Sequence, residues 1–329
     1  MRRALFIISG LIVIFGFVAV GAGLWVYSGF SRPGPLENDT TLIIERGSGA
    51  SAIARELKRA SVIDDTLVFK LGARFLSGPV PMKAGEYLFP SGVSAETAVR
   101  ILQTGKTVIR RVTIAEGLSS SEVVAVLRNT KGLTGRLSPG QAEGSLLPET
   151  YHFSFGDTRA ALIERMQVAQ QKLLSDLWAK RSEGLPLSSP KEALILASIV
   201  EKETGKKGER GRVAAVFINR LRKNMRLQSD PTVVYGITEG KVPLGRKLSR
   251  TDLKQSTPYN TYTIKGLPPT PIANPGRDAI RAVLHPLMSD ELYFVADGSG
   301  GHFFAETLKQ HNRNVARWRK FLRTRNSGG

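Results

Sequence analysis

The feature that most constrains this chain is an uncharged run near its start. Residues 4–31 contain no Asp, Glu, Lys or Arg, and the segment from Leu5 to Trp25 is dense in Ile, Leu, Val and Phe. About 20 consecutive apolar residues are enough for a helix to span the hydrocarbon core of a bilayer. Residues 1–31 are therefore predicted to form a short cytoplasmic N-terminus and a transmembrane anchor.

The flanks of this run predict its orientation. Arg2 and Arg3 precede it, and Trp25 and Tyr27 lie at its far end, where interfacial aromatics are common. We expect a single pass through the cell (inner) membrane, with residues 32–329 on the periplasmic or extracytoplasmic side. The alternative is a cleaved signal peptide, but the apolar region of a signal peptide is usually only about 7–15 residues long.

Composition narrows the range of partners and cofactors. The chain has no Cys, and its four His show no metal-ligand spacing, so we predict no disulfide and no metal site. The net charge of +19 favours an anionic partner such as a lipid surface or a cell-wall polymer. No nucleic-acid-binding motif is present, and an exported domain rarely meets nucleic acid, so that class of partner is not expected.

A repeated pattern follows a Pro- and Gly-rich linker at residues 32–40. Gly47 is followed four residues later by Ser51, which is expected to cap a helix starting at Ala52, and Gly117 and Ser121 repeat this spacing. A partial third copy places a cap at Ser94 and Gly105 after the helix end. These units resemble the LysM type of glycan-binding module. We assign residues 41–135 to a LysM-like α+β region, with a plain scaffold as the open alternative.

The remaining residues, 136–329, are predicted to form a mixed α/β catalytic domain with a basic C-terminal helix, in an α+β protein overall. Ser189, Pro190 and Glu192 have the pattern of a capping box at a helix start. Residues 228–276 contain seven prolines and are expected to form a long ordered loop. Further helices are expected at residues 158–182, 209–223 and 276–284, and a hairpin is expected at residues 292–296 and 302–305.

Two carboxylates, Glu201 and Glu203, end the apolar helix that begins at Pro190. At about 100° per residue the two side chains point about 200° apart, so they do not form a pair on one face. This spacing disfavours a two-carboxylate glycosidase, whose carboxyl groups lie about 5–9.5 Å apart. One carboxyl group at an apolar site tends to hold its proton near neutral pH, as a general acid requires. The alternative is that both are solvated charges in the last helical turn.

Several longer motifs resemble one family. They occur in order along the chain: Ala197–Thr204, Val216–Leu221, Met225–Gly236, Leu248–Arg250, Tyr259–Tyr262, Gly266–Pro269 and Tyr293–Gly298. Together they are similar to the endolytic murein transglycosylase, or YceG-like, family. The resemblance implies a membrane-anchored lytic transglycosylase that cuts within peptidoglycan glycan strands and needs no cofactor.

The resemblance also implies a mechanism and a catalytic residue. One Glu, which maps to Glu203, protonates the oxygen between N-acetylmuramic acid and N-acetylglucosamine. The same group then deprotonates the muramyl C6 hydroxyl, which closes a 1,6-anhydro ring. Glu201 is the second choice for this role. The substrate-binding candidates are Glu149, Asn219, Arg220, Gln228, Asp230, Tyr235, Tyr259, Asn260 and Tyr262, although Asn219 could bridge helices, Asp230 could shape a turn and Tyr262 could be core.

Three other functions stay open at this point. The chain could be a non-catalytic peptidoglycan-binding scaffold of the wall-synthesis machinery, where peptidoglycan synthases would be its partners. An older family label, aminodeoxychorismate lyase, would require pyridoxal phosphate and a cytoplasmic substrate, which a membrane anchor disfavours. A plain hydrolase would leave reducing ends that are one water heavier than anhydro ends.

Overall fold

The computed structural model describes residues 2–138 and 140–327, which form two compact units. Unit 1 comprises residues 1–110 and 152–157, and unit 2 comprises residues 111–151 and 158–329. The chain passes into unit 2 within β3 (Ile109–Thr113) and returns briefly to unit 1 within β4 (Thr150–Ser154), and these two strands pair. Both helices and short two-stranded sheets are present, so the predicted α+β class is confirmed.

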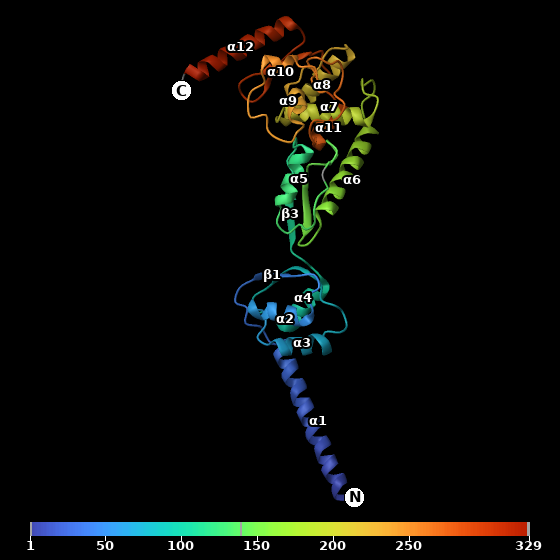
Figure 1. Cartoon of the computed structure of the whole chain (residues 1–329), viewed down its shortest axis with the longest axis vertical. Coiled ribbons are helices and arrows are strands. Elements are labelled where there is room, and N and C mark those ends of the chain that lie inside the picture. Colours follow the sequence, from blue (N-terminus) through green and yellow to red (C-terminus); the bar gives the residue numbers. More distant parts are fainter. Residues whose placement is uncertain (1, 139, 328–329) are drawn as a thin grey trace. The chain divides into compact units, whose positions relative to one another are not determined.

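Unit 1 begins with the apolar helix and continues as a β–α–α–β–α arrangement (Figure 1). Strands β1 and β2 pair antiparallel, with Thr40 opposite Phe89 and Ile44 opposite Gly85. Tyr87, Phe89 and Phe69 are fully buried in one core that the helices cover. The elements are α1 (Arg2–Ser31), β1 (Thr40–Ile44), α2 (Ala50–Arg59), α3 (Thr66–Phe75), β2 (Gly85–Phe89) and α4 (Ala95–Thr104).

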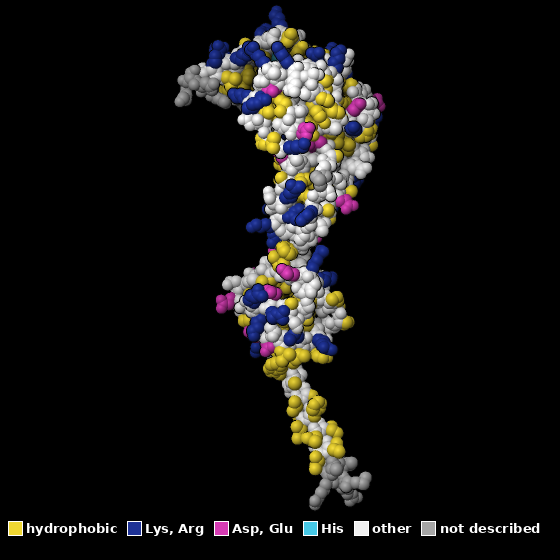
Figure 2. Space-filling model, in the orientation of Figure 1, with side chains coloured by type: hydrophobic (Ala, Val, Ile, Leu, Met, Phe, Trp, Pro, Cys, Tyr) yellow, Lys and Arg dark blue, Asp and Glu magenta, His cyan; other side chains and the backbone are white. Residues whose placement is uncertain are grey.

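Helix α1 is apolar along most of its length and ends inside the core of unit 1. From Ile7 to Ser31 it is long and apolar enough to cross a bilayer, and its side chains are almost all hydrophobic in Figure 2. Its last turn differs, because Phe30 is 1% exposed and belongs to the core. The ring of Phe30 lies over Gly72 of α3, where an added Cβ would be 2.3 Å from a ring carbon. The apolar helix is therefore built into the folded unit.

The predicted helix caps of the repeats are partly confirmed. Ser94 caps α4 by accepting a hydrogen bond from the amide of Thr97, and Gly105 ends this helix in the left-handed conformation. Ser51, in contrast, lies inside α2, whose cap position is Gly49. The repeat pattern did not predict α3 and β2, which lie between the copy at Ser51 and the partial copy at Ser94.

Unit 2 packs helices around one core. Helix α7 lies against α8 and α11 within this core, which includes Leu196, Val213, Phe217 and Ile280. The predicted hairpin is confirmed, with Tyr293 opposite Ala305. The elements are α5 (Ser120–Asn129), α6 (Arg159–Trp178), α7 (Pro190–Glu203), a 3₁₀ turn (Lys207–Glu209), α8 (Arg210–Arg222), α9 (Asp230–Thr238), α10 (Arg250–Lys254), α11 (Arg277–Leu284), β5 (Tyr293–Ala296), β6 (His302–Ala305) and α12 (Leu308–Ser327).

Local chemistry explains where the sequence and the structure differ in unit 2. Ser189 caps α7 as predicted, but the Glu192 carboxylate accepts from the amide and hydroxyl of Ser188, so the reciprocal box does not close. The reciprocal box occurs instead at Ser119 of α5, two residues before the predicted Ser121. The expected loop at residues 228–276 also contains two helices, α9 and α10. Pro231 lies in the first turn of α9, where proline is tolerated, and the other prolines of the segment lie outside both helices.

The packing of Phe30 on Gly72 can be tested by substitution. We expect Gly72→Ala to destabilise unit 1 by about 1–2 kcal/mol, because the overpacking cost exceeds the gain in helix propensity. Hydrogen exchange of the α3 amides measures this loss. The double variant Gly72→Ala/Phe30→Leu should lose less than the sum of the single variants, since the smaller side chain vacates the space. Additive losses would contradict the contact.

Candidate active site

Helix α7 presents its last residue, Glu203, at the edge of the unit 2 core. The helix is apolar and buried from Ile195 to Val200. Thr204 then takes an extended conformation and ends the helix. The sequence therefore places a half-buried carboxyl group at the end of an apolar helix, where it meets other segments of the chain.

The Glu203 carboxyl accepts one hydrogen bond from a hydroxyl, and the residue is half-buried. Ser229 donates a hydrogen bond from Oγ to Oε1 of Glu203 at 2.5 Å. The pKa of Glu203 is raised to about 7, chiefly by burial and also by the nearby negative charge of Asp230. The Ser229 hydrogen bond and the positive charge of Arg220 oppose this increase. Near neutral pH the group can therefore both give and take a proton.

Ser229 has a fixed position because Thr261 and Thr232 both bond to its backbone. It occupies the cap position of α9, but its hydroxyl bonds to Glu203 and makes no capping bond. Its amide donates to Oγ1 of Thr261 at 2.9 Å, and Thr261 in turn shares a hydrogen bond of 2.8 Å with Thr232. Ser229, Thr232 and Thr261 are at most 1% exposed. The hydroxyl that contacts Glu203 is thus preorganised.

A second carboxylate and a tyrosine lie near Glu203. Tyr262 donates a hydrogen bond from its hydroxyl to Oδ1 of Asp230 at 2.6 Å. Burial raises the pKa of Tyr262, and its contact with Asp230 adds to this effect, so the phenol stays protonated and donates. Asp230 is exposed and stands at the first turn of α9, where the helix dipole stabilises a negative charge.

Arg220 of α8 supplies a buried positive charge behind this group. Its guanidinium donates to the backbone carbonyls of Leu292 at 2.6 Å and Leu227 at 2.7 Å, and also to the side chain of Gln228. Burial lowers the pKa of Arg220, while the negative charge of Glu203 opposes this change. Arg220 therefore fixes the segment that leads to Ser229 and contributes charge to the site without being exposed itself.

Glu201 points to a different part of the unit. Its carboxylate accepts from Arg210 at 2.7 Å and from the amide of Gly276 at 2.9 Å. Arg210 is 5% exposed and also pairs with Glu116 at 2.7 Å. Burial raises the pKa of Glu201, and the Gly276 amide and Arg210 oppose this. Glu201 thus joins α7, α8 and the start of α11, and it is committed to an ion pair.

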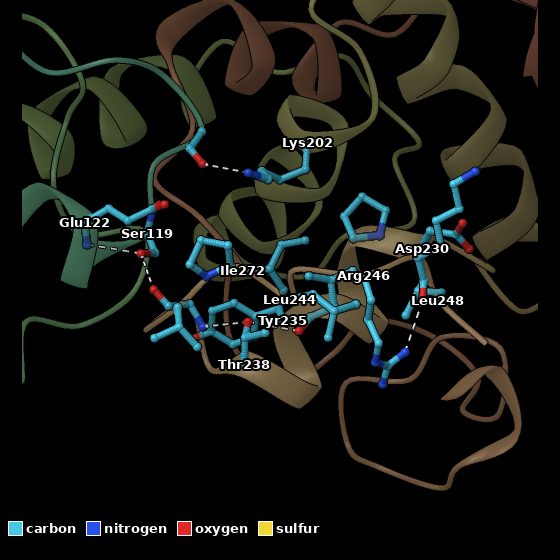
Figure 3. Close-up of a pocket in the computed structure, with 17 residues that line it drawn as sticks. Ser119, Glu122, Lys202, Asp230, Tyr235, Thr238, Leu244, Arg246, Leu248 and Ile272 are labelled. Carbon is cyan, nitrogen blue, oxygen red and sulfur yellow. Dashed lines mark hydrogen bonds between the residues drawn. The ribbon is translucent and has the colours of Figure 1, made fainter. Parts of the chain in front are cut away.

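A cavity of about 700 Å³ adjoins the site (Figure 3). Lys202 and Asp230, which neighbour Glu203 and Ser229 in sequence, both line it, whereas Glu203 itself does not. The Lys202 ammonium donates to the carbonyl of Gly117 at 3.1 Å. Its other lining residues combine apolar, aromatic and basic side chains, including Val234, Tyr235, Leu244, Arg246, Lys247 and Ile272.

The structure distributes the other predicted residues over three environments. Tyr235 lines the cavity and packs on Tyr259, with ring centroids 4.9 Å apart. Asn260 is buried and donates to the carbonyls of three residues around α10, and Asn219 is buried and donates to the carbonyls of Ser289 and Glu291. These two amides hold backbone segments.

Gln228 and Glu149 have a different setting. Gln228 is exposed, immediately precedes Ser229 and adopts a left-handed φ of 53°, which is uncommon for a residue other than glycine. Glu149 is exposed just before β4, and its carbonyl accepts from the amide of Ile114. No contact joins Glu149 to the group around Glu203 among the interactions of residues 2–138 and 140–327.

Three functional contacts were missed by the sequence reasoning. Ser229 lies within a motif that was singled out, but a serine before Asp-Pro has the pattern of a helix cap, which hid its bond to Glu203. Thr261 lies 32 residues from Ser229, so the sequence does not indicate their contact. Arg210 belongs to none of the motifs, so its ion pair with Glu201 was not expected. In the described part of the chain, no group of three or more His, Asp or Glu is arranged to hold a metal ion.

Comparisons with known proteins identify the family to which this chain is similar. The model of the YceG-like family matches residues 42–317. A Bacillus subtilis protein named endolytic murein transglycosylase is 31% identical over 326 residues, covering 88% of this chain and 89% of the relative. A Streptococcus pneumoniae protein of the same name is 31% identical over 325 residues, covering 84% of this chain and 58% of that longer relative.

A solved structure agrees with these matches. The crystal structure of a YceG-like protein from Listeria monocytogenes is 30% identical to this chain, with a TM-score of 0.51. The match covers 84% of this chain and 99% of that one. Because the family model spans most of the chain, the protein belongs to the YceG-like family.

Proposed function

We propose that this protein is an endolytic peptidoglycan lytic transglycosylase. It would cleave the β-1,4 bond between N-acetylmuramic acid and N-acetylglucosamine within glycan strands and leave 1,6-anhydro ends. The observation that carries this proposal is the Glu203 carboxyl, which is held by Ser229 and has a pKa of about 7 because of burial. The names of the curated relatives support the same reaction class.

In the first step Glu203 acts as the acid. Its protonated carboxyl gives a proton to the glycosidic oxygen, the bond to C1 of the muramyl residue breaks, and the N-acetylglucosamine part leaves as an alcohol. Positive charge develops at C1 and its ring oxygen in the transition state. The neighbouring negative charge of Asp230 favours both the protonated form of Glu203 before the step and the cationic sugar during it.

In the second step Glu203, now a carboxylate, acts as the base. It takes the proton from the C6 hydroxyl of the same sugar, and the C6 oxygen bonds to C1, which closes the anhydro ring. The enzyme returns to its protonated form and no water is consumed. The Ser229 hydrogen bond stabilises the ionised form of Glu203 and so favours the proton release of the first step, whereas burial favours the proton uptake of this one.

The cavity next to Asp230 fits a glycan chain in this proposal. Tyr235 offers an aromatic face on which a sugar can stack, and Lys202, Arg246 and Lys247 supply positive charge. Peptidoglycan carries lactyl and peptide carboxylates along its strand, so a basic wall complements it. Tyr259 packs against Tyr235 and holds its ring in place. Gln228 is exposed and immediately precedes Ser229, so its side chain is a further candidate for substrate contact.

The apolar helix α1 supports membrane anchoring as part of this function. We infer a single-pass protein with its N-terminus in the cytoplasm and both units on the extracytoplasmic side of the inner membrane. Such a position is suited to wall growth, including the termination of nascent glycan strands beside peptidoglycan synthases. The compact β–α–α–β core of unit 1 supports a LysM-like glycan-binding module, and it also fits the second candidate function, a non-catalytic wall-binding scaffold.

Digestion of purified peptidoglycan by the detergent-solubilised full-length chain tests the catalytic role. We expect Glu203→Gln to lower the rate of strand cleavage by about 10²–10⁴-fold, because it removes the only proposed acid and base. Glu164→Gln, an exposed carboxylate on α6, is the matched control and should keep full activity. Mass spectrometry should find anhydro ends. Unchanged activity in Glu203→Gln would refute the assignment, and products one water heavier would indicate a hydrolase.

The pH dependence of cleavage tests how the site tunes Glu203. The protonated form is the active acid, so kcat/KM should fall as the pH rises through about 7. Ser229→Ala removes a bond that lowers the pKa of Glu203, so this decline should move to higher pH by about one pH unit. Kinetics measured from about pH 5 to about pH 9, which brackets this pKa on both sides, would give the profiles of both proteins. A decline that stays in place in Ser229→Ala contradicts the role of this bond.

A further inference from the structure

Unit 1 carries an exposed apolar patch on the helix that receives the end of α1. Phe75 is 70% exposed, Leu67 and Leu76 are each 49% exposed, and Val80 is 53% exposed. We refer to these four residues as the α3 patch. In α3 the exposed side chains of Leu67 and Phe75 lie about 80° apart around the helix axis, while Val68 and Phe69 are buried in the core.

Basic side chains accompany the α3 patch. Arg74 projects within about 20° and Lys70 within about 60° of Leu67, both on the side away from Phe75, and the Arg74 guanidinium lies 5.5 Å from the ring centroid of Phe75. A helix with an apolar face and adjacent Lys or Arg is typical of segments that lie at a membrane surface, where the basic groups meet anionic headgroups.

The geometry of α1 determines how far this patch lies from a bilayer. Trp25 and Tyr27 are exposed aromatics at the end of the apolar run, and Phe30 is packed on Gly72 in the middle of α3. The five residues from Trp25 to Phe30 advance a helix by about 7.5 Å. The headgroup region on one side of a bilayer is about 5–7.5 Å thick. With Trp25 at the edge of the hydrocarbon core, where the proposed anchoring puts it, helix α3 lies at the outer part of the headgroup layer.

The arrangement within unit 1 agrees with this distance. Helix α3 lies at the end of the unit from which α1 emerges, and β1 lies on the far side (Figure 1). Hydrophobic side chains gather at that same end in Figure 2. The joint is also rigid, because Phe30 is buried and the Ser31 hydroxyl donates to the Glu96 carboxylate at 3.2 Å.

We propose that the α3 patch inserts into the headgroup layer of the same bilayer that α1 spans. This inference rests on the proposed membrane anchoring. It adds a second membrane contact, which fixes the tilt of unit 1 on the surface and prevents the unit from swinging on α1. A lipid surface fits the patch better than a soluble partner, because α1 already holds the patch at that depth and Lys70 and Arg74 match anionic lipid.

Single cysteines can report the depth of each position, because the chain has no cysteine of its own. The full-length Phe75→Cys variant would be labelled with a fluorophore and reconstituted into vesicles that contain phosphatidylglycerol and a lipid with a nitroxide near its headgroup. We expect the label to lose at least half of its emission to the nitroxide. Leu88→Cys, which is 50% exposed on β2 of the same unit, is the matched control and should keep nearly all of its emission.

A third label separates this inference from the anchoring on which it rests. Phe17→Cys lies within the apolar run of α1 and should be quenched by a nitroxide placed deep in the acyl chains. Quenching at Phe17 without quenching at Phe75 would overturn the docking of α3 and leave the anchor intact. The absence of quenching at both positions would overturn the anchor as well. Energy transfer between Phe75 labels on different chains, without nitroxide quenching, would identify a second copy as the occupant and also overturn the proposal.

Discussion

The hydrogen bond from Ser229 to Glu203 is the interaction on which the proposed chemistry depends. Burial alone would hold the proton on Glu203 so firmly that the group would be a good base in the second step but a poor proton donor in the first. A hydroxyl that donates to the carboxyl favours the ionised form and offsets part of the cost of burial. The balance leaves the pKa of Glu203 at about 7, between its two tasks.

Because successive residues of a helix point about 100° apart, three consecutive residues of α7 lie in three different environments. Glu201 faces the buried Arg210 and joins helices, Lys202 lines the cavity, and Glu203 meets Ser229. Removing the Glu201 carboxylate would leave Arg210 buried with fewer partners, which is costly. Loss of activity in a Glu201 variant would therefore reflect misplaced helices, whereas loss in a Glu203 variant would reflect missing chemistry.

The parts that could be predicted from the sequence are those with local causes. The cap at Ser189, the glycine end of α4 and the hairpin at residues 293–305 follow from short-range patterns, and all three are confirmed. The divergence of Glu201 and Glu203 followed from the helix period alone. The partners of these carboxylates could not be predicted, because Ser229 and Gly276 reach them through tertiary packing across 26 and 75 residues of sequence.

The proposed mechanism requires one carboxyl group, that of Glu203, to hold its proton up to neutral pH. Carbon-13 NMR of the Glu side-chain carboxyl carbons, with Glu203→Gln used to assign the signal, measures this directly without substrate. We expect the Glu203 signal to titrate with a midpoint near pH 7. A midpoint near the ordinary glutamate value of about 4.3 would contradict it, because the group would then be ionised and unable to serve as the acid at neutral pH.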